Sequence, residues 1–271
     1  MFNYSFGLYK SPRDKRDYIL TPFLGVKALS ASFDRTGEMT RVRSQGKEGI
    51  CTWFAMATGC KEWQEKRDYN KFIELSPRLG YEESKKLSGH KEGTTLKATV
   101  EVAKEIGTCE EVEWPFYPND VGKPSSIAYK EALKYRIKTY ARITNINELK
   151  RAIVEVGPAL IGVKVYKGMI SDECKKTGVV VDPSCFQSSL GGHALCAVGY
   201  SDVSPYFKDG HIKVKNSWGN WGDEGYLYLS YKYIKANMLD AFSLVDIDDD
   251  LPYSKTTVGD LSFWQRKNSW V

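Results

Sequence analysis

The chain has 271 residues, of which 42% are hydrophobic and 27% are charged, and its formal net charge at pH 7 is +5. This composition is ordinary for a folded globular protein and excludes a mainly disordered chain. The positive charges are spread along the sequence instead of forming a basic patch, so we expect neither nucleic acid nor an anionic membrane as a partner.

The first part of the chain, residues 1–30, is polar and aromatic without a sustained period, and we expect it to form an N-terminal extension. Residues 1–19 lack the apolar core of a signal peptide, and no stretch approaches the length of a membrane-spanning helix. The chain as read is therefore expected to be cytoplasmic, while a signal removed beforehand would leave export open.

Helical signals follow, and we expect residues 31–140 to form a helical lobe. Residues 51–69 predict a helix whose first turns are apolar all round, as in a buried helix. A second helix is expected to begin at Pro77, with Ser76 as its N-cap. A third is predicted over residues 96–105.

The second half of the chain is strand-rich, apart from a short helix predicted over residues 146–155. Four strands are predicted, at residues 159–166, 194–200, 211–215 and 226–231. We expect residues 141–247 to form a second lobe and residues 248–271 a C-terminal tail. Helices followed by strands indicate an α+β architecture with a catalytic seam between the two lobes.

The chain has six cysteines and three histidines, with no Cys-x-x-Cys pair. This density is well below that of a disulfide scaffold, and the spacing fits no structural zinc site. We therefore expect no metal and no cofactor. Cys174 and Cys185 bracket a short loop, and their pairing is left open because sequence does not give their separation.

Cys51 is a candidate nucleophile because it stands where its helix should begin. A free thiol is mostly protonated at neutral pH, and a helix N-terminus favours the thiolate. The alternative is a buried structural cysteine, which suits Cys60 and Cys196 better than Cys51.

His193 and Asn216 lie at the ends of two predicted strands. His193 opens an apolar run, and Asn216 follows the strand at residues 211–215 and is placed to hold the imidazole ring. Trp218 would shield that hydrogen bond from water. Taken singly, a core histidine and a strand-end turn residue are the alternatives.

Gln45 precedes Cys51 across a loop that contains Gly46 and Gly49. Its side-chain amide is placed to donate to an oxyanion together with the backbone N–H of Cys51. The alternative is a solvated loop glutamine.

Together these segments resemble the papain family of cysteine peptidases. The stretch from Gln45 to Cys51 is similar to the family's Gln-(x)5-Cys segment, and Gly192-His193-Ala194 resembles its Gly-His-Ala strand. The run from Asn216 to Tyr226 resembles the signature Asn-Ser-Trp-Gly-x-x-Trp-Gly-x-x-Gly-Tyr, which is very specific. The resemblance extends over residues 33–244.

The resemblance implies a two-lobe fold, with a helical lobe and an antiparallel β-barrel lobe on either side of an active-site cleft. It implies a hydrolase, namely a thiol protease that cleaves within peptide or protein substrates through a thioester acyl-enzyme. By the same resemblance Cys51 is the nucleophile, His193 the general acid/base, Asn216 the residue that orients the imidazole and Gln45 the oxyanion donor.

The resemblance also implies substrate contacts. Glu92 and Gly93 would pair with extended substrate backbone, and the carbonyl of Gly192 would bind near the scissile bond. Ala194 would line the pocket for the second residue before the cut, and Trp218 would wall the leaving-group side.

The chain departs from the family at Glu48, where the family has a cysteine three residues before the nucleophile, so the family's disulfide cannot form there. Its loss is consistent with a reducing compartment.

Two alternative functions compete with a peptidase. A catalytically silent relative used for binding usually lacks the nucleophile, whereas this chain retains all four catalytic positions. A different Cys/His acyl-transfer enzyme, such as an amidase or a transglutaminase-like one, is disfavoured by the Asn-Ser-Trp-Gly block.

The N-terminal extension suggests intramolecular inhibition. We hypothesise that Lys10 to Tyr18 crosses the cleft and lowers the activity until it moves or is cut. The alternative, at least as well supported by sequence, is that this segment only decorates the barrel lobe.

Overall fold

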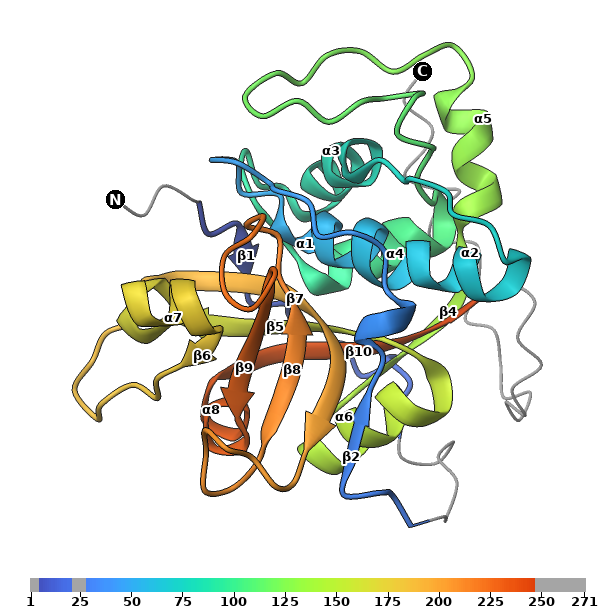
Figure 1. Ribbon diagram of the computed structural model, residues 1–271. Helices are drawn as coiled ribbons and strands as arrows, with labels where there is room; N and C mark the ends of the chain where they lie inside the picture. Colours follow the sequence, from blue (N-terminus) through green and yellow to red (C-terminus); the bar gives the residue numbers. More distant parts are fainter. Residues whose placement is uncertain (1–4, 21–27, 247–271) are drawn as a thin grey trace.

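A computed structural model describes residues 5–20 and 28–246 of the chain, and Figure 1 shows their arrangement. The expectations for residues 1–4, 21–27 and the tail at 248–271 lie outside the described residues. A group of helices packs above a curved, mostly antiparallel sheet, so the expected α+β class is confirmed (Figure 1).

The central helical run begins at Cys51, as predicted, and continues to Tyr69. It comprises α1 (Cys51–Trp53), the π-helix η3 (Phe54–Lys61) and α2 (Glu62–Tyr69). Its π-helical middle was not predicted. That part lies directly against the sheet, where a Cβ added to Gly59 would be 2.7 Å from Cβ of Cys196.

The other two predicted helices of this lobe are confirmed as α3 (Pro77–Ser88) and α4 (Leu96–Glu105). Ser76 caps α3 by accepting a hydrogen bond from the backbone N–H of Arg78, which stabilises the first turn. Two short strands, β1 (Leu8–Tyr9) and β3 (Thr94–Thr95), pair in parallel at the edge of this lobe.

The sheet of the second lobe has eight strands in the order β4-β10-β5-β7-β8-β9-β6, with β2 paired to β7. Its strands are β2 (Ser32–Asp34), β4 (Ile137–Arg142), β5 (Ala159–Val165), β6 (Val179–Val180), β7 (Gly191–Ser201), β8 (His211–Lys215), β9 (Tyr226–Ser230) and β10 (Met238–Asp246). Among the described strands of this sheet, only β6 and β9 pair in parallel. This mostly antiparallel sheet agrees with the fold class that the resemblance implied.

The remaining helices are short. They are η2 (Thr36–Glu38), α5 (Ala128–Ala132), η4 (Leu133–Tyr135), α6 (Ile146–Arg151), η5 (Ala152–Val156), η6 (Lys167–Ile170), α7 (Asp172–Thr177) and α8 (Tyr231–Asn237). The predicted helix at residues 146–155 is therefore α6 and η5 together. Among these helices α5 lies in the helical lobe, while α6, α7 and α8 lie beside the sheet (Figure 1).

Six of the ten strands among the described residues were not predicted from sequence, namely β1, β2, β3, β4, β6 and β10, and β7 begins earlier than expected. β4 and β10 pair with each other and lie at the junction with the helical lobe. No local sequence pattern predicts these two strands. β7 begins at Gly191, so His193 lies inside the strand and not at its first residue. Pairing with β5 extends this strand, because Val165 faces Gly191.

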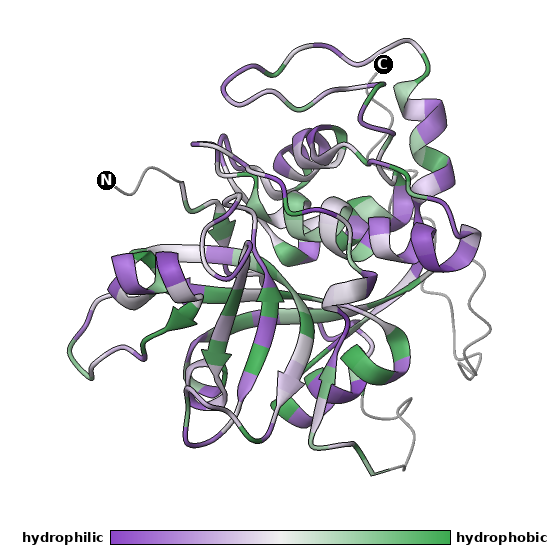
Figure 2. Cartoon of the chain, viewed as in Figure 1, coloured by the Kyte–Doolittle hydropathy of each residue, from purple (hydrophilic) through white to green (hydrophobic). Residues whose placement is uncertain are grey.

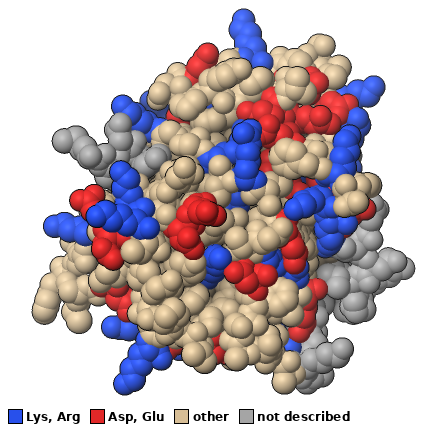
Figure 3. All heavy atoms as spheres, in the orientation of Figure 1, with Lys and Arg blue, Asp and Glu red and all other residues tan. Residues whose placement is uncertain are grey.

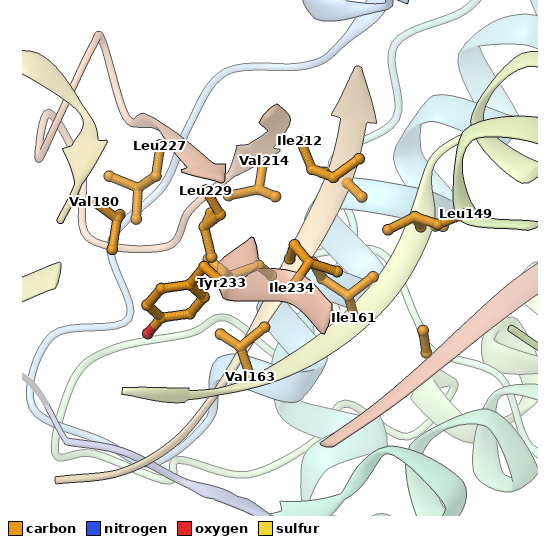
Figure 4. Packing of buried hydrophobic residues seen from close by; sticks show 14 of the residues in the cluster. Leu149, Ile161, Val163, Val180, Ile212, Val214, Leu227, Leu229, Tyr233 and Ile234 are labelled. Carbon is orange, nitrogen blue, oxygen red and sulfur yellow. The ribbon is translucent and has the colours of Figure 1, made fainter. Parts of the chain in front are cut away.

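The two largest of the three apolar clusters among the described residues hold the molecule together. One lies between the sheet and the helices α6 and α8, and Figure 4 shows members from several strands, among them Ile161, Val163 and Leu229, meeting Ile234. The other joins the two lobes, since it contains Trp53 of α1 together with Ala194 and Cys196 of β7. In Figure 2 the strands carry the hydrophobic colour through the middle of the molecule, while α7 is largely hydrophilic.

The surface in the view of Figure 3 mixes acidic and basic side chains without a large area of one sign. Within residues 5–20 and 28–246, no helix combines the length and the apolar character needed to cross a bilayer.

Candidate active site

Cys51 is the first residue of α1 and lies at the seam between the lobes. Its side chain is completely buried, and its sulfur meets the backbone N–H groups of Ala194, Thr52 and Gly7. Ala194 is the neighbour of His193 in β7, so the seam places the thiol beside the strand that carries the imidazole. Gly7 belongs to the N-terminal extension, which therefore reaches the thiol.

His193 is fully buried and held from both its edge and its face. Its Nε2 lies 2.8 Å from Oδ1 of Asn216, and its ring stacks on Trp218 at a centroid distance of 4.5 Å. Because an amide oxygen only accepts, Nε2 must carry the proton, which leaves Nδ1 as the basic nitrogen. Nδ1 has no hydrogen-bond partner among the described residues, so it is available to take a proton.

Asn216 comes directly after β8 and is 5% exposed. Its backbone N–H donates to the carbonyl of Gly225, a glycine whose φ of +90° closes the turn before β9. A Cβ added to Gly225 would be 2.6 Å from Cγ1 of Val42. This close-packed turn fixes where Asn216 presents its amide to the imidazole.

Gln45 is completely buried, and its amide is held in one orientation. Its Oε1 accepts a hydrogen bond of 2.6 Å from the hydroxyl of Ser217, and its backbone N–H donates to the Ser217 carbonyl. The Nε2 group donates to two carbonyl oxygens, those of Glu48 at 2.6 Å and Ser5 at 3.2 Å. Gln45 is therefore oriented to donate to a carbonyl oxygen in the cleft.

Burial sets the protonation of the two reactive groups in this covered state. It raises the pKa of the Cys51 thiol, and the neighbouring backbone N–H groups act in the opposite direction. Burial lowers the pKa of His193 to about 4, despite the hydrogen bond that its ring donates to Asn216. Both shifts favour a neutral thiol beside a neutral imidazole over the thiolate–imidazolium pair.

An ion pair anchors the loop before the nucleophile. Arg78 of α3 is fully buried and bonds Glu48 through Nη1 at 2.6 Å and Nη2 at 2.9 Å. Its guanidinium also lies over the ring of Phe116, 4.8 Å from the centroid. Glu48 stands where the resemblance leads one to expect a disulfide cysteine. A bidentate ion pair thus links this position to the helical lobe.

A second buried pair lies behind the catalytic residues. Lys215 precedes Asn216 and donates to the carbonyl of Thr58 at 2.6 Å and to the hydroxyl of Thr40 at 3.0 Å. Glu62 accepts from Thr40 and from the backbone N–H of Leu75, and burial raises its pKa to about 7. The pair connects β8 to the central helix across the seam.

The residues expected to bind substrate lie around the N-terminal segment at residues 5–9. Gly93 donates its N–H to the hydroxyl of Tyr81, and it is Thr94 whose N–H pairs with an extended segment, at 2.8 Å from the carbonyl of Gly7. Glu92 is exposed beside Gly49 at the rim.

Gly192, Ala194 and Trp218 lie on the sheet side of the cleft. Ala194 is 1% exposed and faces Gly162 across β5 and β7. A Cβ added to Gly192 would be 2.4 Å from the carbonyl oxygen of Leu8, so only glycine leaves room for the segment there.

The occupant of the cleft is the N-terminal segment at residues 5–9. Leu8 is 5% exposed and belongs to the core that joins the lobes. Phe6 packs against the rings of both His193 and Trp218, at centroid distances of 6.5 and 6.3 Å, and Tyr9 stacks on His90 at 4.0 Å. The occupying stretch thus lies just before the stretch that was hypothesised to cross the cleft.

Several residues of the site were missed from sequence. Ser217 orients Gln45, but in the sequence it stood out only as part of a motif. The role of Arg78 could not be inferred from sequence because it depends on the ion pair with Glu48. All six cysteines are free, including Cys174 and Cys185, whose pairing the sequence left open. No group of three or more His, Cys, Asp or Glu side chains that could hold a metal occurs in the described part of the chain.

Comparison with known proteins agrees with this geometry. The family model for papain family cysteine proteases matches residues 29–244. An uncharacterized peptidase C1-like protein of Acanthamoeba polyphaga mimivirus is 29% identical over 85% of this chain and 82% of its own length. Cathepsin K of Gallus gallus is 32% identical over 72% of this chain, which spans 57% of that protein.

Among solved structures, this fold is similar to that of xylellain, a cysteine protease from Xylella fastidiosa, with a TM-score of 0.78 at 26% identity. The match covers 90% of this chain and 97% of that one.

Proposed function

The chain belongs to the papain family of cysteine proteases and is a thiol protease, and we propose that it is an endopeptidase whose nucleophile is Cys51. The observation that carries the assignment of roles is the state of His193, whose Nε2 is bound to Asn216 while Nδ1 is unpaired. That arrangement leaves one basic nitrogen for the thiol proton.

The reaction follows from these groups. Nδ1 of His193 takes the Cys51 proton, and the sulfur forms a bond to the substrate carbonyl carbon. The resulting oxyanion accepts hydrogen bonds from Nε2 of Gln45 and the backbone N–H of Cys51. The imidazolium then protonates the leaving amine as the C–N bond breaks. Water, deprotonated by His193, hydrolyses the thioester and restores the thiol.

Asn216 and Trp218 contribute by position. The amide oxygen of Asn216 holds Nε2–H, so the ring keeps its tautomer and its direction through the cycle. The indole of Trp218 covers one face of the ring and excludes water from that hydrogen bond.

Substrate would bind where the extension now lies. Thr94 supplies a backbone N–H for pairing with extended peptide, and the cavity filled by Leu8 takes an apolar side chain. A substrate must present an extended, unfolded stretch of peptide to bind in this way. This requirement favours cleavage within accessible loops or unfolded chains. Peptides and proteins are therefore the proposed substrates.

The N-terminal extension is proposed to inhibit the enzyme, and its direction would protect it from cleavage. A substrate places the residues before the cut over Thr94 and Ala194 and its leaving amine toward Trp218. The extension runs the opposite way, from Phe6 at Trp218 to Leu8 near Gly162. Its chain is thus reversed relative to a substrate, and the site is filled by a segment that it does not process.

An ion-pair cluster outside the cleft anchors the same extension. Asp17 is bonded to Lys97 of α4 and to Arg142 of β4, and the backbone N–H of Ser11 donates to Asp240 of β10 at 3.1 Å. Residues 11–20 are therefore attached to both lobes. The inhibitory stretch can leave the cleft while this anchor stays bound.

The test is a substitution that dislodges the stretch without removing its anchor. A Cβ at Gly7 would be 1.7 Å from the carbonyl oxygen of Gly49, so Gly7→Val cannot keep the observed position. We expect it to raise kcat/KM on an unstructured protein substrate by about 10-fold or more. Gly37→Ala is the matched control, because a Cβ there meets nothing within 4 Å.

The proposal has two parts, the peptidase activity and its inhibition by the extension. Two controls separate them: the Cys51→Ala variant, and labelling by an epoxide thiol inhibitor. If Gly7→Val and the wild-type chain cleave at the same rate, the inhibition is wrong and the peptidase stands. If neither cleaves protein and the inhibitor leaves Cys51 unmodified in folded Gly7→Val, the chain is a binding protein. Hydrolysis of a different amide without peptide cleavage would instead favour the acyl-transfer alternative.

A further inference from the structure

Two cysteines that the peptidase chemistry does not use face each other across the seam between the lobes. Sγ of Cys60 and Sγ of Cys196 are 3.6 Å apart, although 136 positions separate them in sequence. Cys60 lies in η3, on the helical run that begins with Cys51, and Cys196 lies in β7, three residues after His193. The side chains are 1% and 0% exposed.

Local packing leaves no space for another group between these sulfurs. Gly59 brings the helix backbone against β7, since an added Cβ would lie 2.7 Å from Cβ and 2.9 Å from Sγ of Cys196. A disulfide needs a sulfur separation of about 2.05 Å, so the two atoms must approach by roughly 1.5 Å.

A cation adjoins the pair. The ammonium group of Lys215 acts electrostatically on both thiols, and it is held in place by the carbonyl of Thr58. Burial raises the pKa of Cys60, whereas Lys215 acts to lower it. The thiolate is the species that attacks a disulfide, so the lysine favours the reactive form whenever the seam opens to water.

We propose that Cys60 and Cys196 are a reversible disulfide-forming pair that joins the two lobes covalently, with glutathione disulfide as the oxidant. The Cys60 thiolate attacks glutathione disulfide, forms a mixed disulfide and releases one glutathione thiolate. The Cys196 thiolate then attacks the Cys60 sulfur and releases the second. The two cysteine protons end on the two glutathione molecules, and excess reduced glutathione reverses the reaction.

This bond would act on the site without taking part in its chemistry. It would tie the helical run that starts at Cys51 to the strand that holds His193, close to both residues in sequence. The seam would then stay closed when the N-terminal stretch leaves the cleft. The proposal is independent of the peptidase reaction, because neither Cys60 nor Cys196 touches substrate in it.

The experiment measures the bond at equilibrium. It uses a chain with Cys51→Ala and Cys185→Ser, which lacks the nucleophile and the exposed thiol. This chain is equilibrated in glutathione buffers, both folded and unfolded in concentrated urea. Each equilibrium is approached from reduced and from oxidised protein. Acid quenching, alkylation and peptide mapping give the fraction of the Cys60–Cys196 bridge. Because a bond that suits the fold is favoured by it, the midpoint ratio of reduced glutathione squared to glutathione disulfide should be about 100-fold higher in the folded chain.

Two further measurements complete the test. The bridged protein should melt about 4 °C or more above the reduced protein, and adding Cys60→Ala or Cys196→Ala should abolish that difference. A folded midpoint equal to or below the unfolded one would overturn the proposal. So would a folded-state bridge that contains Cys109 or Cys174 in place of this pair.

Discussion

The ion pair between Glu48 and Arg78 gives the sharpest test of how the nucleophile loop is held. Glu48→Gln leaves the guanidinium buried, at 0% exposure, without its main counter-charge. Removing one partner of a buried pair costs roughly 3–5 kcal/mol. We expect about 2–3 kcal/mol here, because Glu82 lies 3.6 Å away and the carbonyls of Tyr117 and Asp120 also accept from Arg78.

The assay is urea unfolding at pH 7, which gives the change in the free energy of unfolding. Glu131→Gln is the control, because its pair with Lys134 is exposed on the lysine side and should contribute about 0.5 kcal/mol or less. The double variant Glu48→Gln/Arg78→Met should recover part of the loss, since it leaves no buried charge.

Activity adds a second readout of the same substitution. Gln45 donates to the backbone carbonyl of Glu48, so displacement of the loop moves the oxyanion donor. Measured in the Gly7→Val chain, kcat should fall about 10-fold. If Glu48→Gln costs no more than the Glu131 control, and kcat is unchanged, the loop is held by something other than this ion pair.

Three further predictions concern the site and the seam. The pKa of His193 is about 4 in the folded chain and 6.5 when unfolded, so the unfolded state takes up the proton first as pH falls, and folding stability is lost between pH 6.5 and 4. The loss of stability from this group is on the order of 3 kcal/mol. Urea unfolding at pH 7 and at pH 4 should therefore show a weaker pH dependence for His193→Gln than for wild type. Gln45→Ala should lower kcat about 100-fold with little change in KM, whereas Ser217→Ala, which only frees the amide to rotate, should lower it less; equal effects in steady-state kinetics would contradict the positioning role. Gly59→Ala forces a methyl group to within 3 Å of Cys196 and should reduce the free energy of unfolding by about 1–3 kcal/mol in urea titrations, while an unchanged value would mean that the seam is looser than the contacts indicate.

The candidate catalytic groups could be singled out from sequence because each lies in a short local pattern. Cys51 begins a helix with apolar first turns, Asn216 ends a strand, and Gln45 stands before both in a glycine-containing loop. Local periodicity also set α3, with its cap at Ser76, and the strand β8. Such features depend on neighbours within a few residues, and those neighbours are legible in the chain itself.

The features that only tertiary structure decided all join distant segments. The extension reaches the cleft because Leu8 fills an apolar cavity that is formed by residues far along the chain. The sequence around Leu8 does not indicate that this cavity exists. The buried partner of Glu48 and the contact between Cys60 and Cys196 arise in the same way. Sequence alone singled out the candidate catalytic groups, because their patterns are local. Folding determined which segment covers them and what closes the seam, because burial and pairing depend on groups that meet only once both lobes are packed.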